Sequence, residues 1–228
     1  MFPASLFLKI RSSFTGSMHQ WLLLSCAFSC LLVLARVVAT GYTTYLFLYW
    51  NLFLAFVPYL ITRAMMRNVD WLEHPLKKWL LLMVWLIFIP NSFYIITDII
   101  HFPQFRTAPQ WFDLLMLFSF AWNGIVCGVL SVRTVEVILR ASNGRGFSLV
   151  VVFAVMWLNA LGVYIGRYGR FNSWDVLTAP FDLATHVTDL FLHPFDNGVA
   201  WGMTIIYAVF ITLLYIMIRK MGESLRLT

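Results

Sequence analysis

The sequence predicts an all-α, polytopic membrane protein with six transmembrane helices. Hydrophobic residues make up 61% of the chain and charged residues only 11%, whereas soluble domains average roughly 45–50% and about 25%. The apolar residues gather in six runs, each near or above the ~20 helical residues that cross a ~30 Å hydrocarbon core. The basic residues between these runs fall mainly on one side. Together these observations predict the fold class and the orientation.

The six spans are predicted at residues 20–39, 43–66, 76–102, 111–139, 147–168 and 199–218. They would form one membrane domain over residues 19–218, between a cytoplasmic N-terminal segment of residues 1–18 and a cytoplasmic tail of residues 219–228. The third and fourth runs are longer than a span needs, so they are expected to tilt or project. In an alternative interpretation the first run is a signal peptide with a small-residue cleavage site at Val37-Val38-Ala39.

The lysines and arginines predict that both termini are cytoplasmic. Of the sixteen, only Arg36, Arg106, Arg167 and Arg170 lie on the opposite side, and cytoplasmic connections normally hold the excess. A net charge of +6 could suit nucleic acid, but the basic residues are spread over the connections and form no stripe. The expected partner is therefore the lipid bilayer, and no nucleic acid is expected. An anionic lipid or lipid-linked substrate is a further candidate, and a homo-oligomer stays open.

Residues 90–101, PNSFYIITDIIH, place four polar side chains in a strongly apolar run. On an α-helix with about 100° per residue, Asn91, Tyr94, Asp98 and His101 would share an arc of roughly 80°. Ionisable groups inside a membrane span face protein or water and often mark a function. Asp98 and His101 are accordingly the candidate catalytic or proton-handling residues of an outward-facing polar site. Pro90 is expected to kink this helix.

Four asparagines lie on four different spans, in the central to outer half of the predicted bilayer: Asn51, Asn91, Asn123 and Asn159. One interpretation is that each amide forms a hydrogen bond between helices, which contributes about 0.6 kcal/mol on average. The other is that they line a polar cavity open to the outside. The sequence leaves both open.

Residues 166–175, GRYGRFNSWD, follow the fifth span. Arg167 and Arg170 can lie on one face at the depth of the outer phosphates, and guanidinium groups suit bidentate binding of phosphate or carboxylate. Asn172 and Asp175 complete this candidate ligand-binding segment. The alternative is general anchoring of the helix end to lipid headgroups.

The segment after this motif is predicted to form an amphipathic helix in the outer interface, around residues 178–193. Asp175, Asp182, His186, Asp189 and His193 recur at intervals of 7, 4, 3 and 4 residues and would form a stripe about 60° wide. The stripe would lie opposite an apolar face of Phe181, Leu183, Val187, Leu190 and Phe191.

Two interpretations of this stripe remain. The first is a solvated polar face. The second is a divalent metal site, for example for zinc, with Asp182, His186, Asp189 and His193 as ligands. No HExxH or paired CxxC motif accompanies it, so the sequence does not imply any particular cofactor.

Pairs of small residues predict where helices approach closely. Gly124 and Gly128 form such a pair in the fourth span, and Gly162 and Gly166 form another in the fifth.

The runs WNLFLA (residues 50–55), PNSFYIITDIIH and GRYGRFNSWD resemble a family of small bacterial polytopic membrane proteins catalogued as a domain of unknown function. The resemblance covers roughly residues 30–218 and implies a multi-pass protein of the bacterial plasma membrane. It brings no established activity. The shared motifs contain Asn91, Tyr94, Asp98, His101, Arg167, Arg170, Asn172 and Asp175.

Three functions from different classes fit the sequence. In the first, an outward-facing site binds or transports an anionic or cation-coupled small ligand. In the second, an extracytoplasmic membrane enzyme, with or without a metal, acts on a lipid-linked or phosphorylated substrate. In the third, the protein is a structural or accessory subunit whose polar residues only specify helix packing. Whether the protein is an enzyme is left open.

Overall fold

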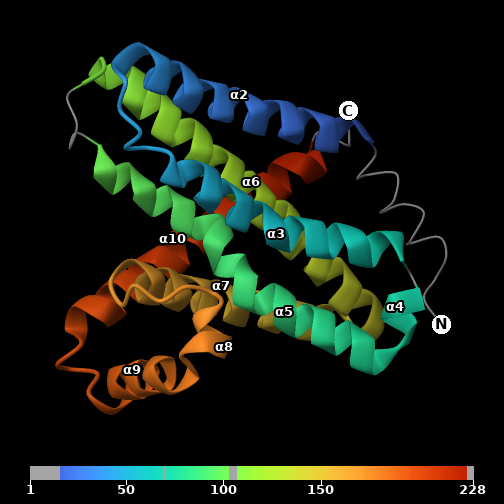
Figure 1. The fold of residues 1–228 in the computed structure, drawn as a ribbon. Coiled ribbons are helices and arrows are strands. Elements are labelled where there is room, and N and C mark those ends of the chain that lie inside the picture. The colour runs from blue at the N-terminus through green and yellow to red at the C-terminus, as the bar shows by residue number, and fades with distance from the viewer. Residues whose placement is uncertain (1–15, 69, 103–106, 225–228) are drawn as a thin grey trace. The chain divides into compact units, whose positions relative to one another are not determined.

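The structure, a computed structural model, describes residues 16–68, 70–102 and 107–224. These residues form nine α-helices and one 3-10 helix, and no strand occurs among them (Figure 1). Six helices are long and apolar enough to cross a membrane. The predicted all-α fold with six spans is confirmed. The sidedness of the termini stays a prediction.

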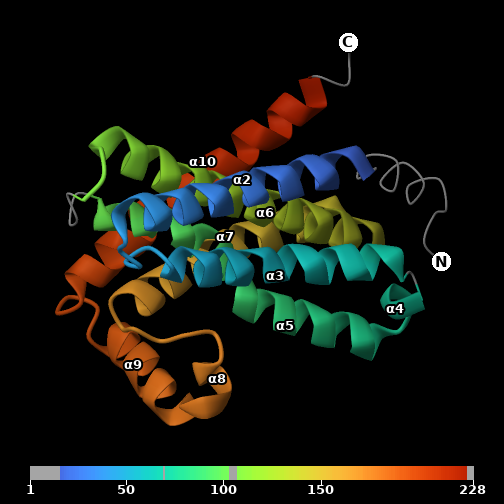
Figure 2. The ribbon, with the colours of Figure 1, turned by 45° about the horizontal axis from the view of Figure 1, so that its top comes forward.

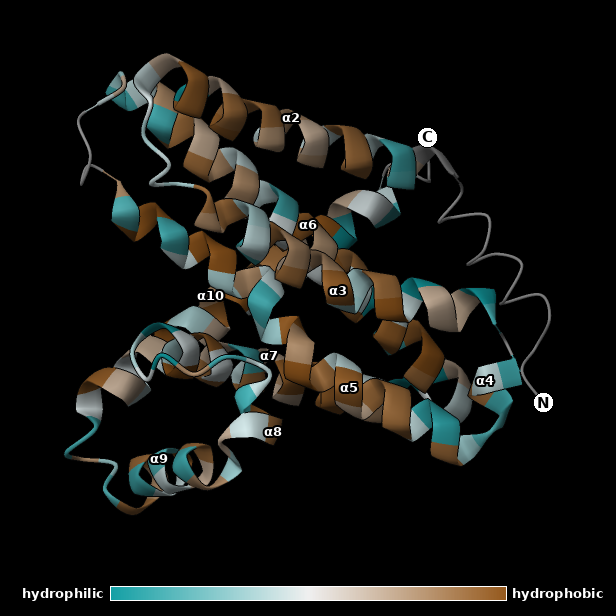
Figure 3. Cartoon of the chain, viewed as in Figure 1, coloured by the Kyte–Doolittle hydropathy of each residue, from teal (hydrophilic) through white to brown (hydrophobic). Residues whose placement is uncertain are grey.

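The membrane-spanning helices begin and end within four residues of the predicted runs, except that the last helix continues six residues past residue 218, into the predicted tail. They are α2 (Gly16–Thr40), α3 (Phe47–Arg67), α5 (Pro75–Tyr94) with its continuation η1 (Ile95–His101), α6 (Gln110–Asn143), α7 (Arg145–Arg167) and α10 (Gly198–Ser224). Three shorter helices are α4 (Asp70–Glu73), α8 (Asp175–Thr178) and α9 (Pro180–Leu192). Hydrophobic residues dominate the middle of the long helices, and hydrophilic residues gather toward helix ends and connections (Figure 3).

The chain divides into two compact units. Unit 1 covers Met1–Phe147 and unit 2 covers Ser148–Thr228, so the boundary falls in the first turn of α7. The predicted single membrane domain stays a prediction.

In unit 1, α3 packs against both α5 and α6, and α2 packs against α6 (Figures 1 and 2). Because α6 has 34 residues, it is about 50 Å long at 1.5 Å per residue and exceeds the thickness of the hydrocarbon core. One buried cluster joins α2, the connection to α3, α3 itself, η1 and α6. It consists of Val33, Tyr45, Leu48, Leu52, Ile95, Met116, Leu117 and Phe120.

The glycine pair of α6 lies at a close helix contact in unit 1, as predicted. A Cβ atom on Gly124 would lie 2.6 Å from the backbone oxygen of Ser92 and would also collide with the side chain of Ile95. A Cβ atom on Gly128 would lie 2.8 Å from the Phe93 ring. Glycine at these two positions therefore lets α6 lie directly on the residues that lead from α5 into η1.

Hydroxyl groups connect α3, α5 and α6 inside unit 1. Ser131 of α6 accepts a hydrogen bond from the Trp85 indole of α5 at 2.6 Å and donates one to the Pro58 carbonyl of α3 at 3.0 Å. Ser92 of α5 donates to the Ala55 carbonyl of α3 at 2.7 Å. These bonds fix the rotation of each helix about its axis, which packing of apolar side chains alone specifies less sharply.

In unit 2, the short helix α9 is attached to the two spans that flank it. Leu190 of α9 is buried with Leu161 of α7 and Ala200 of α10. The Trp201 indole of α10 donates a 3.0 Å hydrogen bond to the Leu190 carbonyl. The Trp157 ring of α7 lies 5.7 Å from the Trp201 ring.

Candidate functional site

The helix that carries the PNSFYIITDIIH motif changes type within the motif. It is α-helical as far as Tyr94 and then forms the 3-10 helix Ile95–His101. The predicted arc of roughly 80° assumed an α-helix throughout and is therefore wrong beyond Tyr94. A 3-10 helix turns by about 120° per residue, so residues three apart lie above one another. Asp98 and His101 consequently share one face of η1.

Asp98 is a buried carboxyl group inside the third span. Asp98 is only 2% exposed. The Asn51 amide of α3 donates a hydrogen bond of 2.7 Å to its Oδ2 atom. One of the four predicted asparagines thus forms a bond between helices, and it reaches the carboxylate of the motif.

An ion pair connects α2 to α6 in the same part of unit 1. Arg36 Nε lies 2.7 Å from Asp113 Oδ1, and Nη2 lies 3.2 Å from Oδ2, so the guanidinium binds the carboxylate with two parallel hydrogen bonds. Nη2 also donates to Thr107 Oγ1 at 3.0 Å. The Arg36 side chain is 1% exposed and that of Asp113 is 5% exposed. The remaining nitrogen, Arg36 Nη1, has no hydrogen-bond partner within the described part of the chain.

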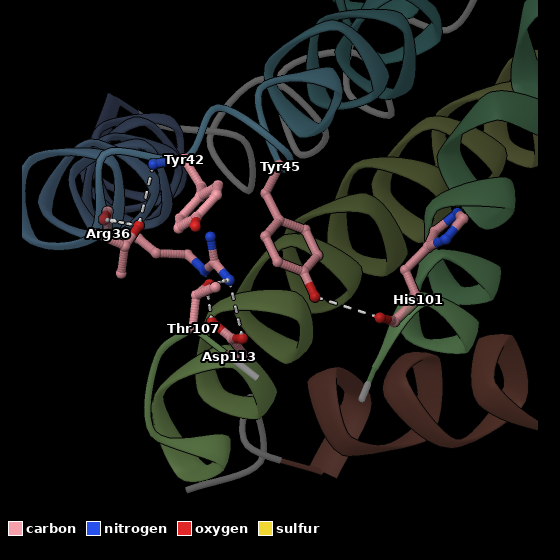
Figure 4. A network of polar contacts seen from close by, with 7 residues as sticks. Arg36, Tyr42, Tyr45, His101, Thr107 and Asp113 are labelled. Carbon is pink, nitrogen blue, oxygen red and sulfur yellow. Dashed lines mark hydrogen bonds and ion pairs between the residues drawn. The ribbon is translucent and has the colours of Figure 1, made fainter. Parts of the chain in front are cut away.

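Tyr45 lies between this ion pair and the motif (Figure 4). The Arg36 guanidinium lies 4.5 Å from the centre of the Tyr45 ring. The Tyr45 hydroxyl donates a hydrogen bond of 3.2 Å to the His101 carbonyl. Burial raises the pKa of Tyr45 above its ordinary value, and so does the nearby Asp113 carboxylate. The hydroxyl is therefore kept protonated and able to donate.

The His101 side chain packs on α3. Its ring meets the Phe47 ring edge to face, with 5.2 Å between the ring centres. We name the polar groups of this end of unit 1 the Arg36–Asp98 cluster. Its members are Arg36, Tyr45, Asn51, Asp98, His101, Thr107 and Asp113.

Sequence reasoning missed part of this cluster. Asp98 and His101 were predicted as site residues, but Arg36, Tyr45 and Asp113 were not, and Asn51 was noted only for its depth. A signal was present, because Arg36 and Asp113 are opposite charges inside two predicted spans at the same end. Charged groups within spans normally pair with one another.

The other motif residues and asparagines differ in their contacts. Asn91 donates to the Phe88 carbonyl of its own helix at 2.9 Å, and Tyr94 is half-buried at the end of α5. Asn123 of α6 donates to Ser29 Oγ of α2 at 2.8 Å, which supports the interpretation as a hydrogen bond between helices. Asn159 of α7 is fully buried, and neither atom of its amide has a hydrogen-bond partner among the residues described.

In unit 2, Asp175 organises the loop that follows α7. Its Oδ2 atom accepts a 2.6 Å hydrogen bond from the Asn172 backbone N–H, and its Oδ1 atom accepts one of 2.8 Å from the Thr178 hydroxyl. These bonds, first of all the one from the Asn172 backbone, hold the pKa of Asp175 below its usual value. Asn172 and Asp175, both predicted as ligand-binding residues, thus stabilise the start of α8.

Arg170 adopts a backbone conformation that favours glycine. Its φ angle is +58°, and a left-handed conformation costs an ordinary L-residue roughly 1–2 kcal/mol. The Phe171 N–H reaches back to the Ile165 carbonyl at 3.4 Å, a bond typical of a helix end with a left-handed residue. Gly169 is also required, because a Cβ atom there would lie 2.7 Å from the Ile165 carbonyl and 3.1 Å from His186 Nε2.

The predicted metal ligands do not form a metal site among the described residues. Asp189 and His193 contact each other, with 2.9 Å between Oδ1 and Nδ1. His186 instead packs its ring on Phe171, with 5.5 Å between ring centres. Nowhere in residues 16–68, 70–102 and 107–224 do three or more His, Cys, Asp or Glu side chains form a group that could hold a metal ion. Asp182 is exposed on α9.

The predicted site residues thus belong to two groups. Asn91, Tyr94, Asp98 and His101 lie in unit 1, whereas Arg167, Arg170, Asn172 and Asp175 lie in unit 2. Their convergence into one outward-facing site stays a prediction.

Comparison with known proteins assigns a family. The family described as "Protein of unknown function (DUF1361)" matches residues 50–217, which cover about three quarters of the chain, so the chain belongs to this family. The match confirms the resemblance to an uncharacterised family. It begins at Trp50, so Arg36 precedes it and Asn51, Asp98 and Asp113 lie inside it. No curated protein and no solved structure matches the chain.

Proposed function

We propose that this DUF1361 protein binds and moves a small ligand together with a proton or cation, at the Arg36–Asp98 cluster. The observation that supports this function is the buried Asp98 carboxyl group in a membrane-spanning helix, hydrogen-bonded by the neutral amide of Asn51. We further propose the bacterial plasma membrane as its location and the predicted outer side as the side of the cluster.

A carboxyl group at this place is suited to exchange a proton or a cation. The buried Asp98 carboxyl group accepts a hydrogen bond from Asn51. Burial of an ionised carboxyl group in a low-dielectric environment nevertheless carries a free-energy cost. Binding of a proton or a small cation would lower that cost. Carboxylates of this kind recur in ion pathways and proton relays of membrane proteins.

The 3-10 helix provides an element that can change shape. η1 continues α5 as a 3-10 helix, whose hydrogen-bond geometry is poorer than that of an α-helix. If the seven residues of η1 became α-helical, the stretch would shorten by roughly 3–4 Å, from about 2.0 to 1.5 Å per residue. The same change would turn Asp98 relative to Asn51. Protonation of Asp98 would thereby be linked to movement of the end of the third span.

The Arg36 guanidinium supports an anionic or oxygen-rich ligand at the same cluster. Two of its nitrogens are held by Asp113 and Thr107, and Nη1 is a buried donor without a partner among the described residues. A buried donor of this kind leaves a large part of its hydrogen-bond energy unused. A ligand carboxylate or phosphate oxygen would supply the missing acceptor.

The test is a thermal-shift comparison of the purified full-length protein, wild type against Asp98→Asn. Probes are sodium, potassium and lithium chloride, inorganic phosphate, acetate and a pH series. We expect at least one probe to raise the melting temperature of the wild type and to have no effect on Asp98→Asn. Glu136→Gln is the matched control, because Glu136 is also a buried carboxyl group in a span but pairs with Arg133 in its own helix at 2.8 Å.

Two outcomes would overturn the proposal. If Asp98→Asn keeps every shift of the wild type, the cluster is not the binding site. If no probe shifts the wild type and Asp98→Asn only lowers stability, the cluster specifies helix packing, as in a structural subunit. For a probe that does bind, proteoliposomes loaded with a pH-sensitive dye would show whether binding is accompanied by proton movement.

A further inference from the structure

Helix α9 has three faces, not the two that the sequence predicted. Leu183, Val187 and Leu190 point into unit 2 and are buried or half-buried. Asp182 and Asp189 lie on a second face that is exposed. Phe181 belongs to neither face, although the sequence placed it with Leu183 and Leu190, because at 100° per residue it lies on the far side of the helix from them.

The third face is apolar and exposed. Phe181 is 85% exposed and Leu192 is 69% exposed. Leu177 in α8 and Phe195 after α9 continue this surface, at 85% and 97% exposure. We call these four residues the α9 apolar face. So large a set of exposed apolar side chains on a short segment normally indicates an interaction site.

The place of this segment in the chain indicates what covers the α9 apolar face. The segment begins where the span α7 ends at Arg167 and finishes where the span α10 begins at Gly198. Both of its ends are therefore held at the boundary of the membrane, on one side. Val199 and Ile206 of α10, at 77% and 73% exposure, are exposed apolar residues of a membrane span, so the apolar surface of α10 adjoins the segment.

Arg170 adds a positive charge at the same boundary. It lies three residues beyond the end of α7, is exposed, and forms no ion pair within the described residues. Asp175, the nearest carboxylate along the chain, already accepts hydrogen bonds from Asn172 and Thr178. A glycine would fit the left-handed backbone at this position better than arginine does, so the side chain itself needs an explanation.

We propose that residues 168–197 form a binding surface for membrane phospholipid. The α9 apolar face enters the boundary between headgroups and acyl chains, and Arg170 binds the phosphate of a lipid headgroup through its guanidinium. Asp182 and Asp189 then face the water, as expected for a helix in the plane of the interface. This surface shares no residue with the Arg36–Asp98 cluster and does not depend on the function proposed for that cluster.

The first experiment measures depth in the membrane. A variant without Cys26, Cys30 and Cys127 receives one spin-labelled cysteine at position 181, 192, 182 or 189 and is placed in phosphatidylglycerol–phosphatidylcholine nanodiscs. Labels at 181 and 192 are expected to be relaxed by oxygen and protected from a water-soluble nickel chelate. Labels at 182 and 189 should show the reverse.

Two results of this experiment would overturn the proposal. Equal access of nickel to all four labels would place the segment in water. Protection of 181 and 192 from both oxygen and nickel would mean that protein, such as a second copy of the chain, covers the face.

The second experiment separates the role of Arg170 in binding from its role in folding. Arg170→Gly relieves the left-handed backbone and should melt at the same or a higher temperature than the wild type. The same variant should retain about fivefold less phosphatidylglycerol in native mass spectrometry, as expected for the loss of one basic residue at a membrane surface. Arg145→Gln, at the opposite end of α7, is the matched control and should retain lipid like the wild type.

Unchanged lipid retention in Arg170→Gly would overturn the role of Arg170. Inorganic phosphate at millimolar concentration is tested as a competitor of the lipid in the same measurement. If it displaces the lipid from the wild type as effectively as added phosphatidylglycerol does, the site binds free phosphate and the assignment to phospholipid is wrong.

Discussion

Unit 1 and unit 2 each contain a basic side chain paired with an aspartate, and the two pairs differ in nearly everything except their chemistry. Arg36 and Asp113 come from positions 77 residues apart, and their side chains are 1% and 5% exposed. His193 and Asp189 are one helical turn apart, and their side chains are 57% and 56% exposed. The first pair connects two spans, whereas the second lies on the surface of one short helix.

The difference shows how burial changes the meaning of a charge. An exposed pair is screened by water and its net effect on stability is small. A buried pair contributes little compared with apolar replacements, but removal of one partner leaves an uncompensated charge in a low-dielectric environment. A single substitution in the pair of unit 1 is therefore expected to destabilise the fold strongly. A single substitution in the pair of unit 2 is expected to change stability little.

The largest effect is expected at Arg36. Arg36→Leu leaves the Asp113 carboxylate buried without its partner and should lower the free energy of unfolding by about 3–5 kcal/mol. The double variant Arg36→Leu/Asp113→Leu should recover most of that loss. Unfolding in mixed detergent micelles measures both. A double variant as unstable as the single one would show that the pair itself, and not the orphaned charge, holds α2 to α6.

A smaller effect is expected from adding one methyl group at a glycine. Gly124→Ala places a Cβ atom against the Ser92 backbone oxygen, which cannot move without moving α5. The expected loss is about 1–3 kcal/mol in the free energy of unfolding. Gly202→Ala in α10 is the matched control in unit 2. Nothing lies within 4 Å of a Cβ atom there, so helix propensity should leave stability unchanged or raised. Equal losses in the two variants would contradict the close contact assigned to Gly124.

The smallest effect is expected from the exposed pair of unit 2. Hydrogen bonds from His193 and then Asn197 hold the pKa of Asp189 below its ordinary 3.8. A carboxyl group whose pKa is lowered on folding stabilises the fold above the unfolded pKa, and this contribution is lost as the pH falls through the folded pKa. Asp189→Asn should therefore change the melting temperature at pH 7 by less than about 2 °C.

At a pH well below 3.8 the small difference between Asp189→Asn and the wild type should vanish, since both then carry an uncharged side chain. Melting curves at neutral and acid pH check this. A large decrease in the melting temperature of Asp189→Asn at pH 7 would contradict the exposed position of this pair on α9.

The sequence alone predicted the features that depend on local composition. The spans came from the length of the apolar runs, and most of their bounds lie within four residues of the helix ends. The helix α10 is the exception, because it continues to Ser224 through polar residues that ended the predicted run at residue 218. The contact of α6 at Gly124 and Gly128 could also be predicted, because only the smallest side chains let two backbones approach so closely.

The sequence could not show which polar groups meet. Asn51 and Asp98 are 47 residues apart, and Arg36 and Asp113 are 77 apart. Their contacts depend on the rotation of each helix about its axis and on its shift along the membrane normal. The hydrophobic pattern of a span constrains neither quantity well, because both the protein side and the lipid side of the helix are apolar.

The PNSFYIITDIIH motif and α9 show the same limit within single elements. A periodicity of 100° per residue assumes an α-helix, so it cannot reveal that η1 is a 3-10 helix. The same periodicity places Phe181 and Leu190 on opposite sides of α9, but it cannot tell which of the two is buried, because both residues are apolar. The sequence determined which residues are apolar and how long the helices are. The tertiary structure decided which of them face protein, because that depends on what each helix is packed against.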